Sequence, residues 1–340
     1  MDLGAKSFRA VVLERRPSGN PVEQDFRVVE LPWVPLQPGQ FRTRNLYVSL
    51  DAGFRNWMNE GAGDAILPAM PLGKPVMGLV LAEVAESLHP EYRVGERLMA
   101  RFAWEEQSIS NGTDFIARLP GELRFSPSAY LGVLGDTGMS AWFGMEIGSP
   151  GPADTVLVSA AGGAVGSIAG QLAKLAGART VGIVGSEAKG HWIREELGYD
   201  GFVLRSGEGS LTDGIRVACP EGVDLFFDNV GGAVLEAAIS CMNARGRIVL
   251  CGAVAGYGAE APLPGPSNLF DVVLKQLTLQ GFMTHLRHER YEEARAALAS
   301  LLDSGQLKNP EHLLEGIGAV PTAFADLFAG RNFGKTVVRL

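Results

Sequence analysis

Residues 156–177 read VLVSAAGGAVGSIAGQLAKLAG, an apolar run that breaks at a glycine cluster and continues with helical spacing. Within it, Ala161-x-Gly163-x-x-Gly166 follows an expected strand and opens an expected helix. This is the glycine pattern of dinucleotide-binding turns, with alanine in the first place. Gly163 lets the backbone approach a pyrophosphate, and Gly166 lets the helix pack closely on the strand. The stretch therefore predicts a nucleotide site at the start of this helix.

Strands and helices alternate on the C-terminal side of this turn. The helix after the turn places Val165, Ile168, Leu172 and Leu175 on one face. The expected strands lie at 179–186, 223–230, 246–254 and 277–283, and helices are expected at 191–198 and 289–303. Apolar strands that alternate with amphipathic helices are typical of an α/β fold with a doubly wound parallel sheet.

The N-terminal part of the chain has a different pattern. Residues 1–125 are rich in short β-type runs separated by proline and glycine turns, which predicts a compact, mostly β unit. Residues 128–148 contain few charges and suit a buried helix pair, and residues 335–340 read as a strand that returns to the first unit. We therefore expect a β-rich domain at 1–125 that is rejoined by 305–340, and a Rossmann domain at 126–304.

Composition limits the possible partners. The 340 residues carry a net charge of −8, and the basic residues are scattered rather than clustered. Because nucleic acids and anionic membranes bind concentrated positive charge, this scattered distribution disfavours both as partners. The N-terminal stretch lacks the apolar core of a signal peptide, so we expect a cytoplasmic protein. Cys219, Cys241 and Cys251 are interpreted as free thiols.

The strand after the glycine turn indicates which cofactor is bound. NAD sites usually end this strand with a carboxylate for the ribose hydroxyl. Here the strand ends in Val184-Gly185-Ser186, followed by Glu187 and Lys189. Lys189 could pair with a 2′-phosphate, and Arg205 is a second basic candidate, whereas Glu187 favours NAD. We favour NADPH as the cofactor.

Several motifs together resemble one family of reductases. They are SAAGGAVGS (159–167), GSEAK (185–189), FDNVGG (227–232), CGAVAGY (251–257) and GRNFGKTVV (330–338). The chain resembles the zinc-independent medium-chain reductases, in the branch of leukotriene dehydrogenase/prostaglandin reductases and curcumin reductases. The resemblance implies a GroES-like domain, a Rossmann domain and, commonly, a homodimer. It also implies reduction of the carbon–carbon double bond of α,β-unsaturated ketones and aldehydes by NADPH.

The resemblance also implies site residues. It assigns Tyr257 to the nicotinamide or the substrate and Lys189 to the 2′-phosphate. The full set of cofactor-binding residues that it implies, with Arg205 added, is Gly163, Ala164, Val165, Gly166, Lys189, Arg205, Asn229, Cys251, Tyr257, Phe282, Met283, Thr284 and Asn332.

The chain departs from the family pattern at three positions. Gly53 replaces a tyrosine that can face the substrate, Asp136 introduces a carboxylate near the expected cleft, and Arg205 replaces a tyrosine. The first two changes predict a wider and more polar substrate pocket, lined by Gly53, Asp136 and Tyr257. Asp51 and Arg55 are interpreted as a structural ion pair rather than a substrate clamp.

Conjugate reduction needs a donor for the charge that develops on the carbonyl oxygen. Tyr257 is the candidate catalytic donor, and the 2′-ribose hydroxyl of the cofactor is the alternative. Tyr257 could instead be a loop aromatic, and Asn229 could be a helix N-cap. A metal site is not expected, because the N-terminal half contains no cysteine and only one histidine, His89.

Two other functions remain open at this stage. The first is an NADPH-dependent quinone reductase of the same superfamily, and the second is a low-turnover NADPH-binding sensor protein. For the dimer, the apolar strand at 277–283 could be an edge that pairs between subunits, or it could be internal.

Overall fold

The computed structural model describes residues 7–63, 67–259 and 262–340 and divides the chain into two compact units. One unit comprises the described residues of 1–131 with His312–Arg331 and Thr336–Leu340. The other comprises Gly132–Glu311 and Asn332–Lys335. Residues 1–6, part of the N-terminal stretch considered above, lie outside the described residues.

The second unit is built on a six-stranded parallel sheet with the order β10-β9-β8-β11-β12-β13. Its strands are β8 (Thr155–Val158), β9 (Arg179–Val184), β10 (Gly201–Leu204), β11 (Val223–Asp228), β12 (Met242–Leu250) and β13 (Thr278–Gly281). The order reverses between β8 and β11, as expected for a doubly wound sheet. The predicted α/β class with a parallel sheet is confirmed.

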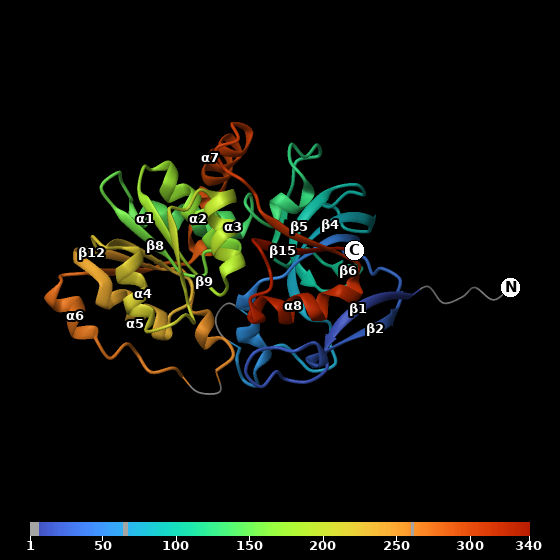
Figure 1. Ribbon diagram of the computed structural model, residues 1–340. Coiled ribbons are helices and arrows are strands. Elements are labelled where there is room, and N and C mark those ends of the chain that lie inside the picture. The colour runs from blue at the N-terminus through green and yellow to red at the C-terminus, as the bar shows by residue number, and fades with distance from the viewer. Residues whose placement is uncertain (1–6, 64–66, 260–261) are drawn as a thin grey trace. The chain divides into compact units, whose positions relative to one another are not determined.

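Helices cover both faces of this sheet (Figure 1). One face carries α1 (Asp136–Gly148), α2 (Ala164–Leu175) and α3 (Glu187–Leu197). The other carries α4 (Leu211–Ala218), α5 (Gly232–Cys241) and α6 (Leu269–Leu274). The 3-10 helix η5 (Thr284–Arg290) and the helix α7 (Tyr291–Asp303) follow β13.

The core of the second unit lies between the sheet and these helices. Val156, Leu157, Phe226 and Phe227 are fully buried, which explains why β8 and β11 read as continuous apolar runs. The helix α2 is predicted with four apolar residues on one face. Ile168 and Leu172 on that face are buried, whereas Leu175 in the last turn is exposed.

The segment 128–148 does not form the expected helix pair. A short 3-10 helix, η3 (Pro127–Tyr130), precedes the single helix α1. Gly138 explains the tight turn between them, since a Cβ there would lie 1.7 Å from the Val133 carbonyl oxygen. The turn therefore fixes where α1 begins and places Asp136 in its first position.

The first unit is mainly β structure. Its strands are β1 (Ser7–Leu13), β2 (Phe26–Pro32), β3 (Phe41–Ser49), β4 (Met77–Ser87), β5 (Arg97–Ala103), β6 (Gln107–Ser110), β7 (Ile116–Arg118) and β14 (Glu311–Glu315). Strands β1 and β2 pair with each other, and strand β15 (Lys335–Arg339) lies between β14 and β3 in a separate seven-stranded sheet.

Short helices complete the first unit. They are η1 (Glu23–Asp25), η2 (Ala52–Met58), η6 (Ile317–Ala319) and α8 (Val320–Ala329). The Trp104 ring packs against Phe324 of α8 with a 4.9 Å centroid separation. Arg55 donates to the carbonyl oxygens of Pro17 and Gly19 and to the side chain of Asn59. None of the described helices has both the length and the apolar character needed to span a membrane.

Candidate functional site

The glycine turn joins the carboxyl end of β8 to the first turn of α2. The N–H of Gly163 donates to the carbonyl oxygen of Ala160 at 2.9 Å, which closes the turn. A Cβ on Gly166 would lie 2.4 Å from the same oxygen, so only glycine fits there. Ala164 and Val165 belong to the first helical turn, whose N–H groups have no acceptor within the helix. The turn can therefore bind a phosphate.

The segment 332–335 of the same unit lies beside this turn. The N–H of Gly334 donates to the carbonyl oxygen of Gly162 at 3.0 Å, and Gly163 and Gly334 form a parallel bridge. Asn332 is buried, and its amide donates to the carbonyl oxygen of Gly334 at 2.9 Å. The structure thus brings Asn332 to the glycine turn, where its amide holds the shape of this backbone.

A buried lysine lies at the start of the helix that follows β9. Lys189 in the first turn of α3 is only 7% exposed, and its ammonium lies 5.8 Å from the centre of the Phe333 ring. Among the described residues the ammonium has no carboxylate or hydrogen-bond partner. Burial, and to a smaller extent the positive charge of Arg205, lowers the pKa of Lys189 to about 8.

Lys189 and Arg205 therefore form a pair of cations without a counter-anion. Arg205 follows β10 directly, and its side chain is exposed. The carboxylate of Glu187 is exposed and lies 3.8 Å from His191, one turn further along α3. Two adjacent cations fit a dianionic phosphate, because a phosphate would offset both the burial of Lys189 and the repulsion between them. The residues present thus fit NADPH better than NADH.

The ends of β8 and β11 are joined by side-chain hydrogen bonds. Ser159 donates to the buried carboxylate of Asp228 at 2.8 Å, and the side-chain amide of Asn229 donates to the Ser159 carbonyl oxygen at 2.8 Å. The N-cap of α5 is Gly231, so the alternative of Asn229 as that cap is wrong. Asn229 instead holds the two central strand ends together, at the point where the strand order reverses.

Cys251 and Tyr257 follow β12 in the other half of the sheet. Burial raises the pKa of Cys251 to about 12, and the carboxylates of Asp136 and Asp228 add to this increase. The Tyr257 hydroxyl oxygen accepts a hydrogen bond from the N–H of Ala253 at 3.2 Å. Burial raises the pKa of Tyr257 above its usual value. The hydroxyl therefore stays protonated at neutral pH and keeps its proton available for donation.

Asp136 meets residues that follow β13. Its Oδ1 accepts a hydrogen bond from the Thr284 hydroxyl at 2.8 Å and another from the Tyr291 hydroxyl at 3.1 Å. The neighbouring residues of Thr284 differ in exposure. The Phe282 ring packs near Gly144 of α1, whereas Met283 is 46% exposed. Two of the predicted residues, Asp136 and Thr284, are thus in direct contact.

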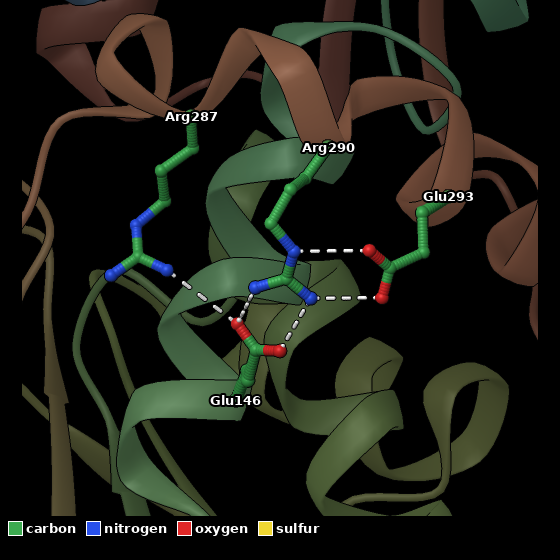
Figure 2. A network of polar contacts seen from close by, with 4 residues as sticks. All are labelled: Glu146, Arg287, Arg290 and Glu293. Atoms are coloured by element: carbon green, nitrogen blue, oxygen red, sulfur yellow. Dashed lines mark hydrogen bonds and ion pairs between the residues drawn. The ribbon is translucent and has the colours of Figure 1, made fainter.

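A polar network fixes the segment that carries Thr284 to α1 (Figure 2). Arg290 forms two hydrogen bonds to the carboxylate of Glu146, at 2.8 and 2.7 Å, and two to Glu293, at 3.0 and 2.8 Å. Arg287 reaches Glu146 at 3.5 Å. The fork of Arg290 therefore links the last turn of α1 to the first turn of α7.

Gly53 belongs to η2 of the first unit, whereas Asp136 and Tyr257 belong to the second. Its predicted place in one substrate pocket with these two residues stays a prediction. Sequence reasoning missed four residues that make contacts in this unit: Ser159, Asp228, Phe333 and Tyr291. Ser159, Asp228 and Phe333 lie within motifs that were recognised, but nothing local to Tyr291 indicates its partner.

Comparison with protein families gives two matches along the chain. Residues 9–117 match the family described as the N-terminal domain of oxidoreductase. Residues 164–300 match the family described as zinc-binding dehydrogenase. In the described part of the chain, no group of three or more histidine, cysteine or acidic side chains is placed to hold a metal ion. These residues do not fit the zinc that the second description names.

Relatives of similar length define the family. The NADPH-dependent curcumin reductase of Escherichia coli is 34% identical over 98% of this chain and 96% of its own. Prostaglandin reductase 1 of Bos taurus is 36% identical over 98% of this chain and 99% of its own. The structure of CurA from Vibrio vulnificus in complex with NADPH is 34% identical, with a TM-score of 0.88, over 97% of this chain and 98% of that one. The chain therefore belongs to the medium-chain dehydrogenase/reductase family, in the branch that contains the curcumin and prostaglandin reductases.

Proposed function

We propose that this protein is an NADPH-dependent oxidoreductase that reduces the carbon–carbon double bond of α,β-unsaturated ketones or aldehydes. The choice of NADPH as cofactor rests on Lys189, a buried cation next to Arg205 that has no counter-anion among the described residues. The full-length similarity to a curcumin reductase and a prostaglandin reductase supports the reaction.

The proposed cofactor site follows the carboxyl edge of the parallel sheet. Gly163, Ala164, Val165 and Gly166 would hold the pyrophosphate, and Lys189 with Arg205 the 2′-phosphate. Residues that follow the strands of the other half would line the nicotinamide end: Asn229, Cys251, Tyr257, Phe282, Met283 and Thr284. Asn332 would support the site through the backbone that it holds beside the glycine turn.

In the proposed reaction, bound NADPH supplies a hydride for the β-carbon of the substrate. The electron pair of the double bond moves toward the carbonyl, whose oxygen becomes negatively charged. The Tyr257 hydroxyl donates a hydrogen bond to that oxygen, and water supplies the proton that the α-carbon takes up. The N–H of Ala253 orients this hydroxyl from its acceptor side.

We propose that the reaction proceeds without a metal ion, because a neutral phenol at Tyr257 can stabilise the developing charge. Asp136 and Tyr257 of the second unit would line the substrate pocket, and the carboxylate of Asp136 would make it polar.

We further propose a cytoplasmic homodimer. Strand β13 ends the sheet and pairs only with β12 among the described strands, so its outer backbone groups can pair with a second copy. The neighbouring helix α6 exposes four apolar side chains, Leu269, Phe270, Val273 and Leu274. Free cysteines suit a reducing compartment. Sedimentation should give twice the chain mass of 36.1 kDa, and Phe270→Glu should shift the protein to monomer.

Product analysis tests the proposed reaction. The purified protein is incubated with NADPH and a medium-chain 2-alkenal or a related enone, and the product is identified by mass spectrometry and NMR. A saturated carbonyl product is expected. An allylic alcohol would mean carbonyl reduction, and tight NADPH binding without a product would overturn the proposal and favour quinones or a sensor role.

A further inference from the structure

The two carboxylate oxygens of Asp136 differ in their hydrogen bonds among the described residues. Oδ1 accepts two hydrogen bonds, from Thr284 and Tyr291. Oδ2 has no hydrogen-bond or ion-pair partner in the described part of the chain. A carboxylate can accept about four hydrogen bonds, so half of this capacity remains available.

No cation in the described ranges forms an ion pair with the carboxylate of Asp136. Its two partners, Thr284 and Tyr291, are neutral hydroxyl groups. The guanidinium of Arg295 lies near Tyr291, but it donates to the carbonyl oxygen of Leu134 and pairs with Glu292. The carboxylate is only partly exposed to water. A half-buried charge without an opposite charge attracts a cationic group strongly, because water screens it incompletely.

The segments that carry the two hydroxyl partners of Asp136 are linked by ion pairs to the last turn of α1. The network of Glu146, Arg287, Arg290 and Glu293 fixes η5 and α7 to the last turn of that helix (Figure 2). Thr284 begins η5 and Tyr291 begins α7, so both residues sit on segments that this network immobilises. The direction of the Asp136 carboxylate is therefore set by packing rather than by solvent.

Asp136 also lies at the carboxyl edge of the sheet, since its hydrogen-bond partner Thr284 closely follows the end of β13. Its carboxylate is close enough to Cys251, directly after β12, to raise the pKa of that thiol. Cys251 is in turn close enough to Tyr257 to raise the pKa of its hydroxyl. Ligands of open parallel sheets bind outside the carboxyl ends of the strands. Asp136 is thus on the same edge as the proposed donor Tyr257.

We propose that Asp136 determines substrate specificity by binding a positively charged group of the substrate through Oδ2. The inferred substrate class is α,β-unsaturated carbonyl compounds that carry a protonated amine, and compounds that carry a carboxylate are rejected. This inference rests on the proposed enone reduction. Thr284 and Tyr291 are positioning residues, since they act only through the carboxylate.

Three enones with one carbon skeleton test this specificity. One carries a dimethylammonium group, one an isopropyl group of the same shape, and one a carboxylate at the same position. The wild-type protein should favour the cationic enone over the isopropyl enone by about tenfold or more in kcat/KM, as expected for a charge-assisted hydrogen bond. The carboxylate enone should be the poorest substrate. Equal values for the three compounds would overturn the inference without any variant.

Asp136→Asn sharpens the test. The amide oxygen can still accept from Thr284 and Tyr291, but the second position becomes a neutral donor instead of a charged acceptor. The ratio between the cationic and the carboxylate enone should fall to within about threefold, and Asp136→Glu should retain a preference for the cation. The control is Glu289→Gln, which removes an exposed negative charge from η5 and should leave the ratio unchanged.

A binding measurement separates specificity from chemistry. Calorimetry with the saturated dimethylamino ketone and the protein–NADP complex should give an affinity about tenfold weaker for Asp136→Asn than for wild type. An unchanged affinity would contradict the inference. If none of the enones is reduced by the wild-type protein, the proposed function fails instead, so the two failures are distinguishable.

Discussion

The ammonium of Lys189 lies 5.8 Å from the centre of the Phe333 ring, although strands β10 to β13 separate the two residues in the sequence. The same ring packs edge-on against Trp192 at 5.3 Å. These contacts cover Lys189 on one side and withdraw it from water, while no carboxylate among the described residues neutralises it. The lysine is therefore poised for an external anion, which in the proposed function is the 2′-phosphate of NADPH.

Replacement of this lysine should change the choice of cofactor. Lys189→Ala removes a charge-assisted contact to the phosphate that NADH lacks. We expect a loss of about 2 kcal/mol for NADPH, roughly thirtyfold in Kd, and little change for NADH. Fluorescence titration with both cofactors checks this. Lys174→Ala, which removes an exposed lysine paired with Asp200, is the matched control. Equal losses for the two cofactors would remove the basis for choosing NADPH.

NADPH affinity should also depend on pH. The pKa of Lys189 in the free protein is lowered to about 8, chiefly by burial, and a bound phosphate would raise it again. Below this pKa the ammonium is already charged and affinity should be constant. Above it, binding requires proton uptake, so the affinity should fall by up to about tenfold per pH unit.

Calorimetry between about pH 7 and pH 9.5 in two buffers of different ionisation enthalpy measures both the affinity and the proton uptake. NADH should show no comparable slope over this range. The same slope for both cofactors, or a flat NADPH profile, would contradict a role for Lys189 in phosphate binding.

The glycine turn should tolerate no side chain at Gly166. In Gly166→Ala the Cβ would lie 2.4 Å from the Ala160 carbonyl oxygen and 2.8 Å from the Ala161 Cα, so the backbone must shift. We expect a lower Tm and a loss of binding for both cofactors, since the phosphate-binding turn itself is displaced. Gly185→Ala is the control, because a Cβ there meets no atom within 4 Å. Normal NADPH binding by Gly166→Ala would show that the turn is not the pyrophosphate site.

Tyr257→Phe should affect turnover more than binding. The change removes the proposed donor to the carbonyl oxygen, and positioned proton donors usually contribute about 100-fold or more. We therefore expect a fall of that size in kcat with a small change in KM, measured by steady-state kinetics with an enone. A fall of less than about threefold would assign the stabilisation to the 2′-ribose hydroxyl of the cofactor. Tyr47→Phe in β3 serves as the unrelated control.

The sequence determined the features that depend on near neighbours in the chain. The glycine turn, the alternation of strands and helices, and the cations Lys189 and Arg205 all follow from local patterns. A turn needs Gly166 whatever surrounds it, because the clash is with Ala160 only a few residues away. Apolar runs such as β11 predict parallel strands, because both faces of such strands are buried.

Only the tertiary structure decided the contacts that join distant segments. The hydrogen bonds of Asp136 to Thr284 and Tyr291 span 148 and 155 positions, and that of Glu146 to Arg290 spans 144. Such pairs depend on how η5 and α7 pack on α1. The hydrophobic periodicity of the sequence does not indicate this packing. Local backbone geometry is set by sterics within a few residues, whereas a site is completed by the packing of side chains that the chain brings together only when it folds.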